Sequence, residues 1–272
     1  MTEISKIRVT GKDRVTVLHN ILTNDIKNIP IGKSVPTALL SAQGKIKMFM
    51  EVHVLETWIL LIVEPGFAEK TISFIDQFII SEDVALEDIS DSYQFPASLT
   101  PQFIFPKDQA SEIYRIENGI PRYGVDMDEN TTFSETGLDK IAVSWTKGCY
   151  PGQEVVARLD TYGGLHRKIR GFIFEARELP KAGDKIYSLT PSFILPRKTG
   201  EERGEGKEIG EITSAAVSKK LQKGIALGYL AKGYFEKNIP VRIASEGNFI
   251  EARTSGFPLV TRDGDDIQER SS

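Results

Sequence analysis

The sequence contains few of the residues that build metal sites or membrane spans. Among 272 residues there is a single cysteine, Cys149, so no disulfide can form within the chain and no zinc or iron–sulfur site can be built from its own thiolates. The three histidines, His19, His53 and His166, lack the spacing of a zinc site. The longest uninterrupted apolar run, Trp58–Val63, is much shorter than the roughly 20 residues of a membrane-spanning helix. We therefore expect no resident metal and no membrane association.

An excess of charge of one sign is also absent. Lys and Arg number 34 and Asp and Glu number 38, which gives a formal net charge of −4. A slightly acidic chain has no overall positive field to hold phosphates, so we expect no direct binding of nucleic acid. The N-terminal residues contain neither an apolar segment nor an Arg- and Ser-rich leader. Together with the lone cysteine, this favours a cytoplasmic protein.

Hydrophobic patterning predicts two kinds of architecture along the chain. Alternating or continuous apolar runs predict strands at Ile46–Val54, Trp58–Val63 and Val84–Ile89. Between the last two, the apolar residues of segment 68–79 have the spacing of a helix. This order indicates a small α+β layer. From Ile169 onward, short alternating segments separated by Gly and Pro predict an all-β barrel or sandwich.

One stretch, Lys147–Arg158, combines several features that matter chemically. Pro151-Gly152 marks a sharp turn, and a helical pattern follows directly. Cys149 is therefore expected just before a helix N-terminus, with Lys147 two residues away, and both influences favour the thiolate. A small apolar cysteine packed beneath a turn fits the same residues, so the pattern alone leaves both interpretations open.

Five segments, in this order, resemble the YgfZ-type folate-binding proteins, which are related to the glycine-cleavage T-protein (aminomethyltransferase) family. The segment Lys-Gly-Cys-Tyr-Pro-Gly-Gln-Glu is the most specific of them, and the resemblance covers most of the chain. The segments are Val9–Arg14 with Leu18-His19 and Leu22–Ile26, Gln43–Ile46, Arg115–Pro121, Lys147–Glu154, and Ile209–Ser214 with Ile225–Tyr229.

The resemblance implies an α+β fold, a three-domain T-protein-like ring around a central folate-binding channel, with a C-terminal β-barrel. Residues 1–45 and 105–165 would form a discontinuous folate-binding domain, 46–104 an inserted ferredoxin-like α+β domain, and 166–260 the barrel. The polar residues 261–272 are expected to be a frayed tail.

The resemblance also implies a cofactor, tetrahydrofolate, and the residues that would bind it. Glu117 matches the carboxylate that binds the pterin, for which a carboxylate is chemically suited because it accepts two hydrogen bonds from the 2-amino group and the ring N–H. A surface glutamate in a turn is the alternative interpretation. Cys149 would be the reactive thiol, assisted by Lys147. The remaining residues expected at the folate site are Arg115, Gly148, Gln153, Glu154 and Arg158.

One departure from the T-protein pattern affects the expected function. An acidic pair follows the glycine turn of the T-protein, but counting from Gly44 these positions are Met48 and Phe49, which cannot act as a general base. Only Asp25 and Glu51 are acids near them in sequence.

The complete Cys149 segment together with this departure favours an accessory factor for iron–sulfur cluster assembly or repair. The resemblance implies this role, which in the related proteins is linked to tRNA thiomethylation through an iron–sulfur enzyme. The factor's partners would be folate and iron–sulfur assembly factors or client enzymes. The alternatives are a folate-dependent aminomethyltransferase or demethylase acting on an amine, and a docking module that binds no ligand.

Overall fold

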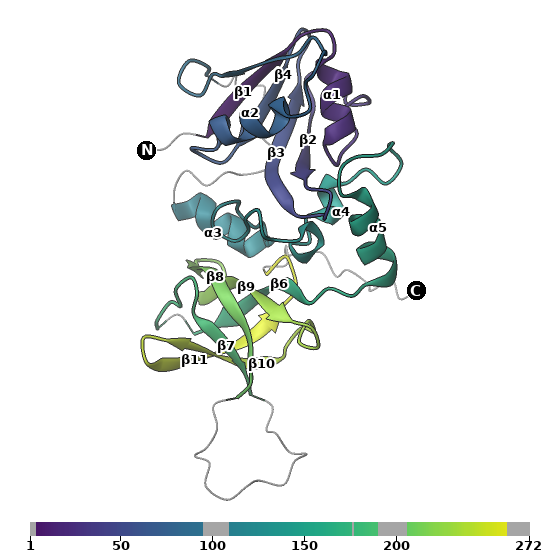
Figure 1. Cartoon of the computed structure of the whole chain (residues 1–272). Coiled ribbons are helices and arrows are strands. Elements are labelled where there is room, and N and C mark those ends of the chain that lie inside the picture. The colour runs from purple at the N-terminus through teal and green to yellow at the C-terminus, as the bar shows by residue number, and fades with distance from the viewer. Residues whose placement is uncertain (1–3, 95–108, 176, 190–205, 260–272) are drawn as a thin grey trace, which may run out of the picture. The chain divides into compact units, whose positions relative to one another are not determined.

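The computed structural model describes residues 4–94, 109–175, 177–189 and 206–259, so the expected tail at 261–272 lies outside the described residues. The chain forms two compact units (Figure 1), which we call unit 1 and unit 2. Unit 1 comprises Met1–Glu112 and Pro121–Lys168, and unit 2 comprises Ile113–Ile120 and Ile169–Ser272.

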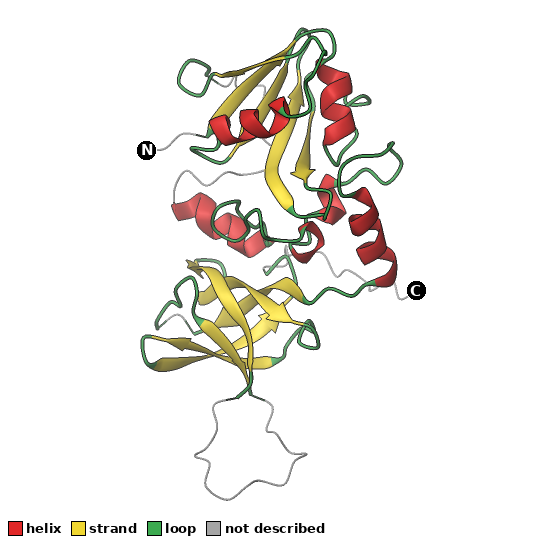
Figure 2. Cartoon of the chain, viewed as in Figure 1, coloured by secondary structure: helices red, strands yellow, loops and turns green. Residues whose placement is uncertain are grey.

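Unit 1 is built on a five-stranded antiparallel sheet in the order β2-β3-β4-β1-β5. Figure 2 shows this sheet accompanied by helices. The strands are β1 (Ser5–Thr10), β2 (Ser34–Leu40), β3 (Ile46–Val54), β4 (Ile59–Val63) and β5 (Ala85–Asp88). The helices are α1 (Arg14–Ile21), α2 (Ala68–Asp76), α4 (Asp139–Ala142), α5 (Gln153–Tyr162) and the 3-10 turn η1 (Phe133–Glu135). No helix in the described part of the chain is both long and apolar enough to cross a membrane.

The core of unit 1 follows from the local apolar pattern. Ile7 and Val9 alternate along β1 and are fully buried, and Leu18 is buried on the inner face of α1. A fully buried Leu or Ile side chain stabilises a fold by about 1.5–3 kcal/mol relative to leaving it exposed. The sheet and its helices are therefore held together mainly by the apolar stripes that the sequence displays.

The sheet groups residues differently from the domains that the resemblance implied. β3 and β4 follow position 46, yet β3 pairs with β2 and β4 pairs with β1. In these pairs Ala38 lies opposite Phe49, and Ile7 lies opposite Leu61. Residues on both sides of position 46 thus share one hydrogen-bonded sheet, where a boundary between two domains was expected.

Unit 2 is a closed barrel of six strands in the order β10-β11-β6-β9-β8-β7. Closure pairs every strand on both sides and leaves no open sheet edge. The expected α+β class with a C-terminal β-barrel is confirmed. The strands are β6 (Arg167–Phe174), β7 (Lys185–Ser188), β8 (Glu208–Ser218), β9 (Lys223–Ala231), β10 (Pro240–Ser245) and β11 (Asn248–Ser255), and the end of helix α3 (Gln109–Asn118) belongs to this unit.

The start of α5 packs tightly against the turn between β2 and β3. Gly152, the residue before α5, has φ +81°, and a Cβ atom there would lie 2.5 Å from the carbonyl oxygen of Ser41 and 3.1 Å from the Cα of Gly44. A residue with a Cβ atom therefore does not fit this position without strain, whereas glycine does. Two of the segments that carry the resemblance, around Gly44 and around Gly152, are therefore in direct contact.

Replacing Gly152 by alanine should destabilise the protein more than the same change at a matched glycine. Gly152→Ala combines a left-handed backbone with overpacking, and we expect a loss of about 2–4 kcal/mol in the free energy of unfolding. Gly32 has φ +79° but open space around its Cβ position, so Gly32→Ala should lose only about 1 kcal/mol. Urea unfolding measures both, and equal losses would show that the contact with Ser41 is unimportant.

Candidate functional site

The only cysteine lies in a short exposed loop between two buried residues. The loop connects α4 to α5, and both Gly148 and Cys149 are exposed. Lys147 on one side and Tyr150 on the other are buried. The thiol is therefore not packed beneath the turn, which was one of the two interpretations of the sequence, and it is open to reagents or partners.

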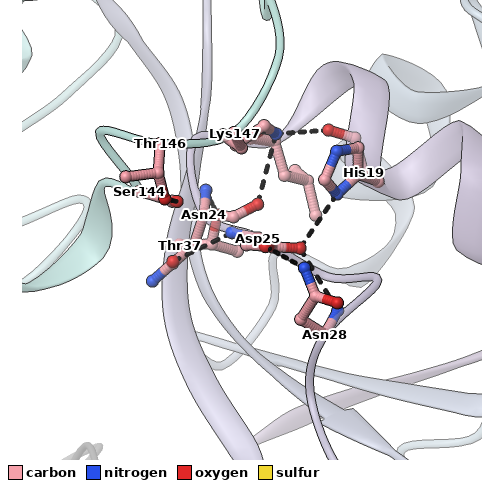
Figure 3. Close-up of polar contacts among 9 residues, drawn as sticks. His19, Asn24, Asp25, Asn28, Thr37, Ser144, Thr146 and Lys147 are labelled. Carbon is pink, nitrogen blue, oxygen red and sulfur yellow. Dashed lines mark hydrogen bonds and ion pairs between the residues drawn. The ribbon is translucent and has the colours of Figure 1, made fainter.

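The ammonium group of Lys147 points into the end of helix α1 (Figure 3). It donates hydrogen bonds to the backbone carbonyls of His19 and Leu22, and a third to the carbonyl of Asn24 at 3.2 Å. Carbonyl groups at a helix C-terminus carry partial negative charge and favour a cation there. Lys147 thus ties the loop that precedes Cys149 to a segment more than 120 residues earlier in the chain.

Burial lowers the pKa of Lys147 to about 8; the charge of Asp25 opposes this change and that of Lys27 adds to it. An ammonium group has three donors, and three carbonyls receive them. The sulfur of Cys149 is not among the described contacts of this group. The sequence suggested that Lys147 acts directly on the thiol of Cys149. No described contact joins the two groups, so this effect stays a prediction.

A second polar group lies beside Lys147 and was not predicted as a site. Asp25 accepts hydrogen bonds from the side chain of Asn28 at 2.6 Å and from its backbone N–H at 3.2 Å, and its Oδ1 lies 3.3 Å from Nδ1 of His19 (Figure 3). Burial alone would raise the pKa of Asp25, but the bonds from Asn28 and the charge of His19 outweigh it and lower the pKa. Burial, followed by the charge of Lys147, lowers the pKa of His19. The sequence signals for this group were the Leu18-His19 and Leu22–Ile26 matches and the place of Asp25 near the missing acidic pair.

Thr23 holds the chain that leads into the cysteine loop. Its hydroxyl donates to the carbonyl of Ala142 at 2.6 Å and accepts from the N–H of Ala38 at 2.9 Å. Its own carbonyl accepts from the N–H of Ser144 at 3.1 Å. The residues after α4 are thus bonded to the same turn that Lys147 reaches.

Asp25 and Glu51, the acids nearest in sequence to the positions of the missing acidic pair, differ in their exposure to solvent. Met48 and Phe49 are buried in the core on β3. Glu51, also on β3, is fully buried and accepts a hydrogen bond from Ser34 at 2.6 Å, with His53 Nε2 3.1 Å away. Asp25 keeps 23% of its side chain exposed, so it is the more accessible of the two acids that the sequence offered.

The other residues expected in this stretch lie on or before α5. Gly148 is exposed, Gln153 is half-buried, and Glu154 and Arg158 are exposed. Glu154 occupies the first turn of the helix, where the helix dipole favours a negative charge.

Two of the expected folate residues, Arg115 and Glu117, lie at the end of α3 in unit 2. Arg115 is fully buried and donates to the hydroxyl of Ser214 at 2.7 Å. Glu117 is 4% exposed and accepts a hydrogen bond from the hydroxyl of Ser218 at 2.6 Å, while its Oε2 lies 3.7 Å from Nζ of Lys220. Glu117 is therefore a buried helical residue, whereas the alternative interpretation was a surface glutamate in a turn.

The predicted site residues are thus distributed over both units. Unit 1 contains Cys149 and its neighbours, and unit 2 contains Arg115 and Glu117. The carboxylate of Glu117 fits a pterin chemically, because each carboxylate oxygen can accept two hydrogen bonds and Oε1 has one from Ser218. Within the described residues, no group of three or more His, Cys, Asp or Glu side chains is placed to hold a metal ion.

Comparison with known proteins identifies relatives of this chain. Residues 167–260 match the family described as the glycine cleavage T-protein C-terminal barrel domain. An aminomethyltransferase of Thermosipho melanesiensis is 23% identical over 95% of this chain and 84% of its own length. An aminomethyltransferase of Halothermothrix orenii is 31% identical, over 44% of this chain and 29% of its own length.

A solved structure has the same fold. The crystal structure of glycine cleavage system aminomethyltransferase T from Bartonella henselae aligns with a TM-score of 0.74 at 16% identity, over 95% of this chain and 84% of that one. The chain therefore has a T-protein-like α+β fold with a six-stranded C-terminal barrel, and it is related to the aminomethyltransferase family.

Removing the hydroxyl of Thr23 should destabilise unit 1. Thr23→Val keeps the shape but leaves the buried N–H of Ala38 and carbonyl of Ala142 without this partner, so we expect a loss of about 1–3 kcal/mol in the free energy of unfolding. Thr16→Val, at an exposed position of α1, is the matched control and should change stability by less than about 0.5 kcal/mol. Equal stability of the two variants in urea unfolding would contradict the role of Thr23.

Proposed function

We propose that this relative of the glycine cleavage T-proteins binds tetrahydrofolate and acts as an accessory factor in the assembly or repair of iron–sulfur clusters. Its clients would include iron–sulfur enzymes such as those that thiomethylate tRNA. The observation that carries the proposal is the exposed thiol of Cys149, which is held between two buried residues. A free thiol in the chain also favours the reducing cytoplasm as its compartment.

Folate binding is supported by the buried carboxylate of Glu117 and by the family relationship. A carboxylate accepts paired hydrogen bonds from the 2-amino group and ring N–H of a pterin. Arg115, which is bonded to Ser214, would hold the end of α3, and with it Glu117, in place beside the pterin. Tetrahydrofolate, when bound, supplies a carrier for one-carbon units. The proposal also assigns Gly148, Gln153, Glu154 and Arg158 to folate binding, on the resemblance alone.

The role in iron–sulfur chemistry is supported by the exposure and number of the thiols. An iron–sulfur cluster is usually held by four protein ligands, and Cys149 supplies one. The cluster would therefore be cargo, with its other ligands coming from an assembly factor or a client enzyme. Met48 and Phe49, buried where the T-protein carries acids, argue against aminomethyl transfer by the T-protein route.

A second candidate function is aminomethyl transfer or demethylation on an amine substrate. The observation that favours it is Asp25, which is partly exposed and lies close enough to Lys147 for its charge to raise the pKa of that residue. Because its own pKa is lowered, Asp25 is ionised at neutral pH. An ionised carboxylate pairs with a cationic amine, although it is a weak general base.

Tetrahydrofolate should bind the full chain with a dissociation constant of about 1 μM, which corresponds to about −8.2 kcal/mol. At a free ligand concentration 100 times that constant, binding should stabilise the protein by about 2.7 kcal/mol and raise Tm. Glu117→Gln removes the charge but keeps the shape, and loss of charge-assisted bonds should weaken binding about 10- to 100-fold. Glu251→Gln, on the exposed side of β11, is the control. Isothermal titration calorimetry with no heat from the unmodified protein, and no thermal shift, would overturn the proposed cofactor.

Cys149→Ala should leave the fold intact and abolish the cellular role. Because the thiol is exposed, its removal should change the free energy of unfolding by less than about 0.5 kcal/mol. In cells lacking this protein, the variant should fail to restore tRNA thiomethylation, whereas Thr146→Ala in the same loop should restore it. Full restoration by Cys149→Ala would remove the thiol from the mechanism. Formation of methylene-tetrahydrofolate from tetrahydrofolate and methylamines in vitro would support the second candidate.

A further inference from the structure

The cysteine loop is bounded by two side chains that contact each other. Gly148 and Cys149 are exposed, whereas Lys147 and Tyr150 on either side are buried. Nζ of Lys147 lies 5.2 Å from the centroid of the Tyr150 ring, within the range of a cation–π interaction. The two buried ends of the exposed loop are therefore in contact with each other.

The same ammonium group anchors this pair to the rest of unit 1. Its hydrogen bonds to the carbonyls of His19, Leu22 and Asn24 join the loop to the end of α1 and the residues after it. Bonds from a charged donor are shorter and stronger than neutral ones. With three carbonyls and one aromatic ring around it, the ammonium connects the end of α1 and the residues after it to Tyr150.

Further bonds fix the chain on both sides of the loop. Upstream, Thr23 bonds to the backbone of Ala142 and Ser144. Downstream, the N–H of Gln153 donates to the carbonyl of Tyr150 at 3.2 Å, directly before the close contact of Gly152 with the β2–β3 turn. The chain is therefore hydrogen-bonded on both sides of the loop.

The charged groups that face Lys147 come from one neighbouring segment. Asp25 favours its charged form, and Lys27 opposes it. The imidazole of His19 lies in the last turn of α1, and its own pKa is lowered in part by Lys147. These groups, like the three carbonyls, act on the ammonium from the side of α1.

We propose that Lys147 is a positioning residue for Cys149. Its ammonium group fixes the exposed thiol in place by joining the end of α1 to the ring of Tyr150, and it does not act on the sulfur itself. This inference rests on the proposed function, in which the thiol of Cys149 performs the chemistry.

The test compares two measurements on the full chain: the pH profile of Cys149 alkylation by iodoacetamide, and hydrogen exchange of the amides of Ser144 and Gln153, which donate to the carbonyls of Thr23 and Tyr150 on either side of the loop. In Lys147→Met, exchange of these two amides should become about five-fold faster or more, because the loss of the Lys147 hydrogen bonds lets the chain beside the loop open more often. The midpoint of the alkylation profile should stay at its unmodified value. Lys147→Arg keeps the charge and the donors, and should restore slow exchange at least in part. Lys27→Met, which removes a neighbouring cation that is exposed, is the control and should change neither measurement.

A direct action on the sulfur predicts the opposite pattern. Removing a cation that stabilises the thiolate would raise the alkylation midpoint by about one pH unit or more. Such a shift in Lys147→Met, with or without faster exchange, would overturn the proposal, and so would unchanged exchange.

A second pair of variants keeps the test decisive if Lys147→Met does not fold. The hydroxyl of Tyr150 is buried without a hydrogen-bond partner among the described residues, so Tyr150→Phe should behave like the unmodified protein. Tyr150→Leu removes the ring from Lys147 and should speed exchange, again with an unchanged midpoint. Equal exchange in these two variants would overturn the proposal.

Both measurements use the isolated chain without folate or cluster. Their outcome is therefore independent of the cellular test of Cys149→Ala, and the two hypotheses can fail separately.

Discussion

The arrangement around the thiol depends on one buried charge. Taking an ammonium group out of water is costly unless its donors are bonded. Lys147 meets this requirement with backbone carbonyls alone, at the point where the end of α1 presents them. The carbonyl of His19 belongs to the last turn of α1, and those of Leu22 and Asn24 follow the helix directly, so the constraint passes from the end of α1 to the loop that carries Cys149. The exposed thiol thus has a defined place although it makes no described contact of its own.

The sequence predicted the elements of the site better than their connections. The turn at Pro151-Gly152 and the helix after it were predicted correctly, because a turn signal and a 3.6-residue period are local properties. The direction of the Lys147 side chain was not predicted. Its partners are backbone carbonyls, which exist at every residue and leave no signature in the sequence, and they lie more than 120 positions away.

The same limit explains the difference in domain organisation. Apolar patterning predicted strands at Ile46–Val54 and Trp58–Val63; the first has the predicted bounds, and the second begins one residue later, at Ile59. Alternation does not specify which strand pairs with which, so the pairing of β4 with β1 across position 46 came only from the structure. Glu117 is a different case. Its alternative interpretation was a surface glutamate in a turn, whereas helix α3 carries Ile116 and Glu117 into the interior of unit 2.

The distribution of acids in unit 1 decides which group is suited to carry chemistry. Glu51 is sealed in the sheet by Ser34, so it cannot meet a substrate without opening the sheet. Asp25 is partly exposed, but hydrogen bonds from Asn28 satisfy it and hold it ionised, which makes it a poor acceptor of a proton at neutral pH. Its nearest cationic neighbours belong to the same cluster, where its charge helps to keep Lys147 protonated. Asp25 is thus part of the support for the cysteine loop, whereas the thiol of Cys149 is exposed, as the proposed function requires.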